Sequence, residues 1–199
     1  MKILVNGCAG RMGLTVVRLI DADPVLELHG GLEGPEHADM GADLGVLAGL
    51  PENGLPVRAD ALDLISGADA VIDFSTPAAT LEMAGLCAQA RIVHIIGTTG
   101  FSAEDEAALG AAARHATLVK SGNMSLGVNL LGALVRRAAA ALGKDWDIEI
   151  LDMHHRHKVD APSGTALLLG EEAAKGRNVD LAETRDSGRD GMTGARKAG

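Results

Sequence analysis

The sequence contains no tyrosine, one tryptophan and two phenylalanines, so aromatic residues make up only 2% of it. Hydrophobic residues still make up 47% of the sequence, which is enough for a core. Since few of them are aromatic, alanine, leucine, valine and isoleucine must fill the interior. No apolar run approaches the roughly 20 residues that a membrane-spanning helix needs. Met1 leads directly into a short apolar segment, with no secretory signal before it. We therefore expect a globular, cytoplasmic protein with no membrane partner.

Basic residues are fewer than acidic ones, 18 against 27, and the formal net charge at pH 7 is −9. Nonspecific binding of nucleic acid needs a basic surface, so we expect no nucleic-acid partner. The only cysteines, Cys8 and Cys87, lie far apart and match no metal or redox spacing. Two isolated thiols fit a reducing compartment and predict no metal site.

Strand and helix signals alternate up to about residue 120, with a long loop containing one helical turn expected over 34–56. Alternation of this kind predicts an α/β fold, a parallel sheet covered by helices on both faces. A capping box formed by Ser102 and Asp105 opens the last helix of this region, which reaches residue 114. The other predicted elements are strands over 3–5, 25–32, 70–74, 92–96 and 117–119, and helices over 11–20 and 77–90.

Past residue 121 the pattern changes. A long helix over 126–142, with Gly143 as the residue after its C-cap, precedes one strand-like segment over 147–153 and a helix from about 165 to 175. Residues 176–199 are polar and show no apolar periodicity. A single strand exposes unpaired backbone groups. It must join the first sheet, pair with another chain, or continue into residues beyond 199, and we favour the last.

A glycine-rich segment links the first predicted strand to the first helix, with the spacing G-x-x-G-x-x-G. Gly7 allows a sharp turn, Gly10 lets the backbone approach a pyrophosphate, and Gly13 lets the helix pack on the strand. Glu33 follows the second strand, where a carboxylate can accept hydrogen bonds from an adenosine ribose. Glycine-rich turns and surface glutamates are each common. The prediction of NADH or NADPH binding therefore rests on their combination, a turn between a strand and a helix followed by Glu33 at the end of the next strand.

Gly34 follows Glu33, so no arginine stands beside it to hold a 2′-phosphate. We therefore expect NADH to bind at least as well as NADPH. Arg11 could still reach an added phosphate, which keeps dual use of the two cofactors open.

The segment 154–166 reads His-His-Arg-His-Lys-Val-Asp-Ala-Pro-Ser-Gly-Thr-Ala, five residues that can carry positive charge followed by a helix start. Pro162 fixes φ, Ser163 and Thr165 offer capping hydroxyls, and Gly164 permits close approach to the backbone. Cationic side chains beside a helix N-terminus favour a small molecule with one or more carboxylates. A solvated surface loop is the alternative, and a zinc site is less favoured because no cysteine or carboxylate lies at ligand spacing.

Together these segments resemble the 4-hydroxy-tetrahydrodipicolinate reductase family of lysine biosynthesis. The most specific match is the segment 154–166, and the resemblance runs in order across essentially the whole chain. The other matching segments are Gly7-Cys8-Ala9-Gly10-Arg11-Met12-Gly13, Asp73-Phe74-Ser75, Gly97-Thr98-Thr99-Gly100 and Asn123-Met124-Ser125-Leu126-Gly127-Val128-Asn129.

The resemblance implies a Rossmann-type dinucleotide-binding domain over 1–125 and a partial α+β substrate-binding and oligomerisation domain over 126–199. It implies that NAD(P)H reduces a cyclic dicarboxylate, and that the protein is a homotetramer if the substrate domain is complete. Its catalytic residues would be His154, the proton donor, and Lys158. Its substrate-binding residues would be His155, Gly164, Thr165 and Thr99. Its cofactor-binding residues would be Gly7, Gly10, Arg11, Met12, Gly13, Glu33, Phe74, Ser75, Gly97, Thr98 and Thr99.

Chains of that family continue past the point corresponding to Gly199 and complete the substrate sheet, so we expect this chain to be truncated. Two alternatives to a reductase remain. One is a noncatalytic fragment that binds NAD(P)H, and the other is a different dehydrogenase, acting on a semialdehyde or a hydroxy acid. The second alternative is weaker because neither Cys8 nor Cys87 is placed for nucleophilic work.

Overall fold

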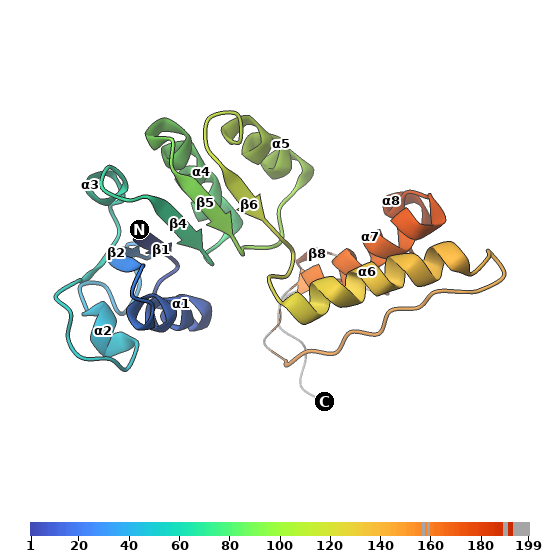
Figure 1. Cartoon of the computed structure of the whole chain (residues 1–199), viewed down its shortest axis with the longest axis horizontal. Coiled ribbons are helices and arrows are strands. Elements are labelled where there is room, and N and C mark those ends of the chain that lie inside the picture. Colours follow the sequence, from blue (N-terminus) through green and yellow to red (C-terminus); the bar gives the residue numbers. More distant parts are fainter. Residues whose placement is uncertain (157, 159, 189–190, 193–199) are drawn as a thin grey trace. The chain divides into compact units, whose positions relative to one another are not determined.

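Figure 1 shows a computed structural model of the chain, which describes residues 1–156, 158, 160–188 and 191–192. The chain divides into two compact units, Met1–Ser121 and Gly122–Gly199. His157 and Val159 of the cationic segment, and the last residues, 193–199, lie outside the described residues.

The first unit is built on a six-stranded sheet with the order β3-β2-β1-β4-β5-β6. Every neighbouring pair is parallel, which confirms the predicted α/β sheet. The strand order reverses between β1 and β4, and ligands of such sheets bind at the carboxyl ends beside this point. The strands are β1 (Lys2–Asn6), β2 (Glu27–Leu32), β3 (Val57–Arg58), β4 (Ala70–Asp73), β5 (Val93–Ile96) and β6 (Leu118–Lys120).

Helices cover both faces of this sheet (Figure 1). Side chains alternate along β1, so Ile3 and Val5 pack toward α1 and α2 while Leu4 packs toward α3 and α4. A third cluster joins α4, α5 and β5 around Ile96. The helices are α1 (Arg11–Ala22), α2 (Leu44–Leu47), α3 (Leu62–Ile65), α4 (Pro77–Ala90) and α5 (Ala103–Ala112).

Local sequence explains where these helices begin. Thr76 caps α4 by accepting a hydrogen bond from the N–H of Ala79, and Pro77 occupies the first turn. The predicted capping box of Ser102 and Asp105 is present at the start of α5. The strand β3 and the helix α3 were not predicted, because elements of two and four residues are too short to show periodicity.

The second unit consists mainly of helices α6 (Leu126–Ala141) and α7 (Gly164–Arg177), which pack against each other. Both confirm the predicted helices within two residues, although α6 ends at Leu142 in an extended conformation. Two short strands, β7 (Asp160–Ala161) and β8 (Gly191–Met192), pair in antiparallel fashion. No helix in the described part of the chain is both long and apolar enough to span a membrane.

One prediction for this unit was wrong. Residues 147–153 form no strand, because a strand needs a neighbour to pair with and neither sheet includes this segment. The polar region after residue 176, for which no element was predicted, includes the helix α8 (Leu181–Thr184) and β8. Leu181 packs against Gly170 of α7, a tertiary contact that sequence periodicity does not reveal.

Candidate active site

The glycine-rich segment forms a tight connection between β1 and α1. Gly7 has a φ of +77°, and a Cβ there would lie 2.5 Å from the carbonyl oxygen of Phe74. A Cβ on Gly13 would lie 2.1 Å from the carbonyl oxygen of Gly7. Only glycine satisfies both positions, and the N–H groups of Gly7 and Cys8 donate to the carbonyl of Leu32, tying the turn to β2.

The N-terminus of α1 is open to a ligand. Gly10 is the N-cap residue and makes no side-chain cap, and Arg11 and Met12 beside it are exposed. The first N–H groups of a helix have no acceptor within the helix, and the helix dipole favours an anion there. The glycine-rich turn and this helix end therefore fit the pyrophosphate of a dinucleotide.

Glu33 lies directly after β2, and its carboxylate reaches the glycine-rich segment. Its Oε1 accepts a hydrogen bond of 2.9 Å from the backbone N–H of Ala9. Glu33 is half-buried, and Gly34 beside it is exposed. The carboxylate predicted to bind a ribose thus lies at the glycine-rich turn, where the dinucleotide is expected.

The thiol of Cys8 lies under this turn and is unsuited to nucleophilic catalysis. Cys8 and Cys87 are both buried, free cysteines. Burial, followed by the charge of Glu33, raises the pKa of Cys8 to about 12. Burial likewise raises the pKa of Cys87 to about 12. Since the thiolate is the nucleophile, neither residue supports the chemistry of a dehydrogenase with a catalytic cysteine.

The loops after β4 and β5 hold the other predicted cofactor residues. The ring of Phe74 covers Gly97, where a Cβ would lie 2.1 Å from the ring. Thr99 is exposed, whereas Thr98 is buried. The hydroxyls of Ser75 and Thr98 both donate to Asp73, at 2.6 and 3.3 Å. The hydroxyl protons of Ser75 and Thr98 are therefore used within the fold, as is the backbone N–H of Ser75, which also donates to Asp73.

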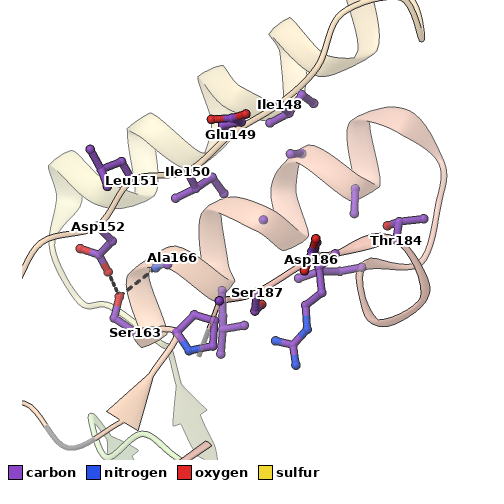
Figure 2. A pocket seen from close by; sticks show the side chains of 18 of the residues that line it. Ile148, Glu149, Ile150, Leu151, Asp152, Ser163, Ala166, Thr184, Asp186 and Ser187 are labelled. Atoms are coloured by element: carbon purple, nitrogen blue, oxygen red, sulfur yellow. Dashed lines mark hydrogen bonds between the residues drawn. The ribbon is translucent and has the colours of Figure 1, made fainter. Parts of the chain in front are cut away.

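In the second unit, Asp152 connects two parts of the cationic segment. His154 Nε2 lies 2.8 Å from Asp152 Oδ2 in an ion-pair contact, and Ser163 Oγ donates to the same carboxylate. Ser163 also caps α7 by accepting a hydrogen bond of 3.0 Å from the N–H of Ala166 (Figure 2). One carboxylate thus holds both the predicted proton donor and the first turn of the helix.

An open pocket of about 1220 Å³ brings Asp152, His154, Lys158 and Ser163 together. Figure 2 shows Asp152 and Ser163 at one end of this pocket, where α7 begins. Burial raises the pKa of the Asp152 carboxyl, but hydrogen bonds from Ser163 and His154 and the charge of Lys158 outweigh it and keep that pKa below its usual range. The pocket therefore combines a carboxylate with two side chains that can carry protons.

Three predicted substrate residues of this unit lie outside the pocket lining. His155 is exposed, and its carbonyl accepts a hydrogen bond of 3.2 Å from the N–H of Lys158. Gly164 begins α7, and Thr165 Oγ1 accepts a hydrogen bond of 2.9 Å from Asn123 Nδ2. The segment before α6, which shares the family resemblance, therefore supports the start of α7.

Sequence analysis missed Asp152. The signal for it was present, because Asp152 and His154 are two residues apart in a segment predicted to be extended, and such residues lie on the same side. Asp152 lies just before the segment 154–166 that carries the family resemblance, which is why it was not among the predicted site residues. In the described part of the chain, no group of three or more His, Cys, Asp or Glu side chains could hold a metal ion.

Comparison with known proteins places these two sites in one family. Residues 1–124 match the family described as dihydrodipicolinate reductase, N-terminus, and residues 127–199 match its C-terminus. The chain is 67% identical over 200 residues to the 4-hydroxy-tetrahydrodipicolinate reductase of Parvibaculum lavamentivorans, and 60% identical over 200 residues to that of Sinorhizobium fredii. Both alignments cover 100% of this chain and 74% of the relative.

A solved structure, dipicolinate-bound dihydrodipicolinate reductase from Paenisporosarcina sp. TG-14, is also similar. Its TM-score is 0.68 at 26% sequence identity, over 97% of this chain and 71% of that one. The family match covers both units, and the relatives are similar over the full length of this chain. The chain therefore belongs to the dihydrodipicolinate reductase family.

Proposed function

We propose that this chain is an oxidoreductase that reduces 4-hydroxy-tetrahydrodipicolinate to tetrahydrodipicolinate with NADH or NADPH, a step in diaminopimelate and lysine biosynthesis. Its relatives carry the name of that reductase. The observation that carries the proposal is the pocket in which His154 and Lys158 lie beside the Asp152 carboxylate and the N-terminus of α7.

Unit 1 supplies the cofactor site. Gly7, Gly10 and Gly13, with Arg11 and Met12, would hold the pyrophosphate, and Glu33 would bind the adenosine ribose. The loops after β4 and β5 would line the remainder through Phe74, Ser75, Gly97, Thr98 and Thr99. A bound reduced nicotinamide supplies the hydride, and the protein supplies position and protons.

Unit 2 supplies the groups that bind a dicarboxylate. The related structure from Paenisporosarcina binds dipicolinate. In this chain, Lys158, His155 and the N–H groups at Gly164 and Thr165 would bind the two carboxylates, and Thr99 is a further proposed substrate-binding residue. Each hydrogen bond to a charged group contributes about 1.5–3 kcal/mol, so several are needed to offset desolvation of a dianion.

His154 would donate the proton that balances the negative charge left on the substrate by hydride transfer. The Asp152 carboxylate, 2.8 Å from Nε2, orients the imidazole ring. Because Ser163 donates to the same carboxylate and caps α7, the ring and the carboxylate-binding N–H groups are placed as a unit. Lys158, which lines the same pocket, would assist protonation.

We also assign residues 1–125 to dinucleotide binding and 126–199 to substrate binding and assembly. We propose a homotetramer for the protein with a complete substrate domain, which the exposed leucines of α6 support, and cytoplasmic localisation, which the two free thiols support. The net charge of −9 supports the absence of a nucleic-acid partner. Native mass spectrometry tests the tetramer, and a monomer or dimer would contradict it.

The decisive experiment mixes the purified chain with NADH and substrate made in place by the preceding synthase, and follows the loss of NADH absorbance. Consumption that requires both the synthase product and the chain supports the proposal. Binding of NADH, measured by fluorescence, without consumption would leave only the dinucleotide-binding function.

A further inference from the structure

A buried carboxylate at the carboxyl end of β4 joins three strands of the first unit. Asp73 ends β4, and its Oδ2 accepts hydrogen bonds of 3.0 Å from Asn6 Nδ2 at the end of β1 and of 3.0 Å from His94 Nε2 on β5. Asp73 and His94 side chains are both fully buried. This position is the point at which the strand order reverses, next to the expected cofactor.

The other oxygen of Asp73 holds the two loops that follow β4 and β5. Its Oδ1 accepts hydrogen bonds from the backbone N–H and hydroxyl of Ser75, at 3.0 and 2.6 Å, and from the hydroxyl of Thr98, at 3.3 Å. Thr98 accepts in turn from the N–H of Ser75 and from the hydroxyl of Thr80 on α4. The two loops are therefore linked through one carboxylate.

One of the side chains that bond Asp73, His94, belongs to the interior of the strand β5. An ionised carboxylate can only accept, so His94 donates from Nε2. Nε2 therefore carries the proton that His94 donates, and the buried Nδ1 makes no hydrogen bond among the described residues. His94 therefore contributes one directed hydrogen bond to Asp73.

We propose that Asp73 and His94 are positioning residues for the cofactor: the pair holds the loops after β4 and β5 so that their backbones and Thr99 face the dinucleotide. This inference rests on the proposed function. The arrangement explains why the hydroxyls of Ser75 and Thr98 point inward although both residues lie in loops expected to line the cofactor. Asp73 and His94 act through these loops and touch no substrate.

The test compares three histidine variants in NADH binding, measured by fluorescence, and in thermal unfolding. His94→Met keeps the volume but removes the donor, and we expect it to weaken NADH binding about tenfold, because a small displacement of the binding loops is costly. His94→Gln can still donate to Asp73, and we expect it to restore binding to within about threefold of wild type. His29→Met is the control, since His29 on β2 bonds the carbonyl of Leu64 and reaches neither loop.

We expect His29→Met to lower the melting temperature without changing NADH affinity. If His94→Met and His29→Met behave alike, with normal NADH affinity, the positioning role is wrong and His94 is only part of the core. Should His94→Met fail to fold, Thr98→Val removes the hydroxyl that joins the loop after β5 to Asp73, and unchanged NADH affinity in that variant would overturn the inference. Wild-type protein that binds no NADH would instead overturn the proposed function.

Discussion

The carboxylate of Glu33 and the backbone N–H of Ala9 are joined by a hydrogen bond of 2.9 Å. Replacement of Glu33 by alanine would therefore disturb the glycine-rich turn as well as the proposed ribose site. Glutamine keeps an acceptor for Ala9 and removes only the charge. Glu33→Gln therefore tests the negative charge separately from the hydrogen bond to Ala9.

We expect Glu33→Gln to weaken NADH binding about tenfold while NADPH binding stays constant or improves, because the negative charge no longer repels a 2′-phosphate. Fluorescence titration with each cofactor measures the ratio. The exposed Glu36 undergoes the same charge change in Glu36→Gln and should leave the ratio unaltered. Equal weakening of both cofactors by Glu33→Gln would remove Glu33 from the ribose site.

Lys158 lines the pocket with His154, and we expect Lys158→Ala to lower kcat about 10²–10⁴-fold, as loss of an acid–base group does. NADH affinity should change far less. Lys175→Ala is the matched control, because Lys175 is an exposed residue of α7 that pairs with Glu172. Comparable losses of kcat and of NADH affinity in Lys158→Ala would mean that Lys158 maintains the fold or the cofactor site instead.

Ser163 both caps α7 and donates to Asp152, so Ser163→Ala should lower stability and activity together. Loss of the cap costs about 1 kcal/mol in the free energy of unfolding. Ser125 caps α6 by accepting from the N–H of Val128, and Ser125→Ala should cost a similar amount without lowering kcat. Urea unfolding and initial rates on the two variants test this. Normal kcat in Ser163→Ala would show that Asp152 and His154 do not depend on the cap.

The pKa of Asp73 makes a prediction about acid stability. Burial raises that pKa, but hydrogen bonds from His94, Ser75 and Asn6 outweigh burial and hold it below its usual value. A carboxyl with a depressed folded pKa stabilises the protein above its unfolded pKa, and this contribution is lost as the pH falls through the folded pKa. Asp73→Asn should therefore cost about 1–3 kcal/mol at pH 7 and less at pH 3, which lies below the ordinary pKa of an aspartate.

Urea unfolding of wild type and Asp73→Asn at both pH values measures this difference. The exposed Asp69, whose carboxylate accepts from the N–H of Lys2, provides a control in Asp69→Asn. That variant should show a small cost with little pH dependence. A cost for Asp73→Asn that does not shrink in acid would mean that Asp73 is already protonated at pH 7.

The parts of the fold that depend on local chemistry were predictable from the sequence. Gly7 and Gly13 could be assigned because a positive φ and a close backbone approach each exclude a side chain. The capping box of Ser102 and Asp105 could be assigned because both hydrogen bonds lie within one turn. The same holds for the cap at Ser163, three residues before its donor.

Features that depend on distant residues were not predictable. Thr98 lies in a segment with a cofactor-binding signature, but the carboxylate that turns its hydroxyl inward lies 25 residues earlier. The alternating pattern of residues 147–153 indicates a strand, but pairing depends on a neighbour that the pattern does not contain. Asp152 acquires its importance from Ser163, across the cationic segment.

The inaccessibility of Cys8 and Cys87 has a practical consequence. Both thiols are fully buried, and both have a pKa of about 12, so at neutral pH they are neither exposed to nor reactive toward a maleimide. A cysteine introduced at an exposed position such as Glu171 on α7 would be the one reactive thiol of the folded protein. Fluorescent or spin labels can thus be attached site-specifically in the native background, without first replacing either buried cysteine.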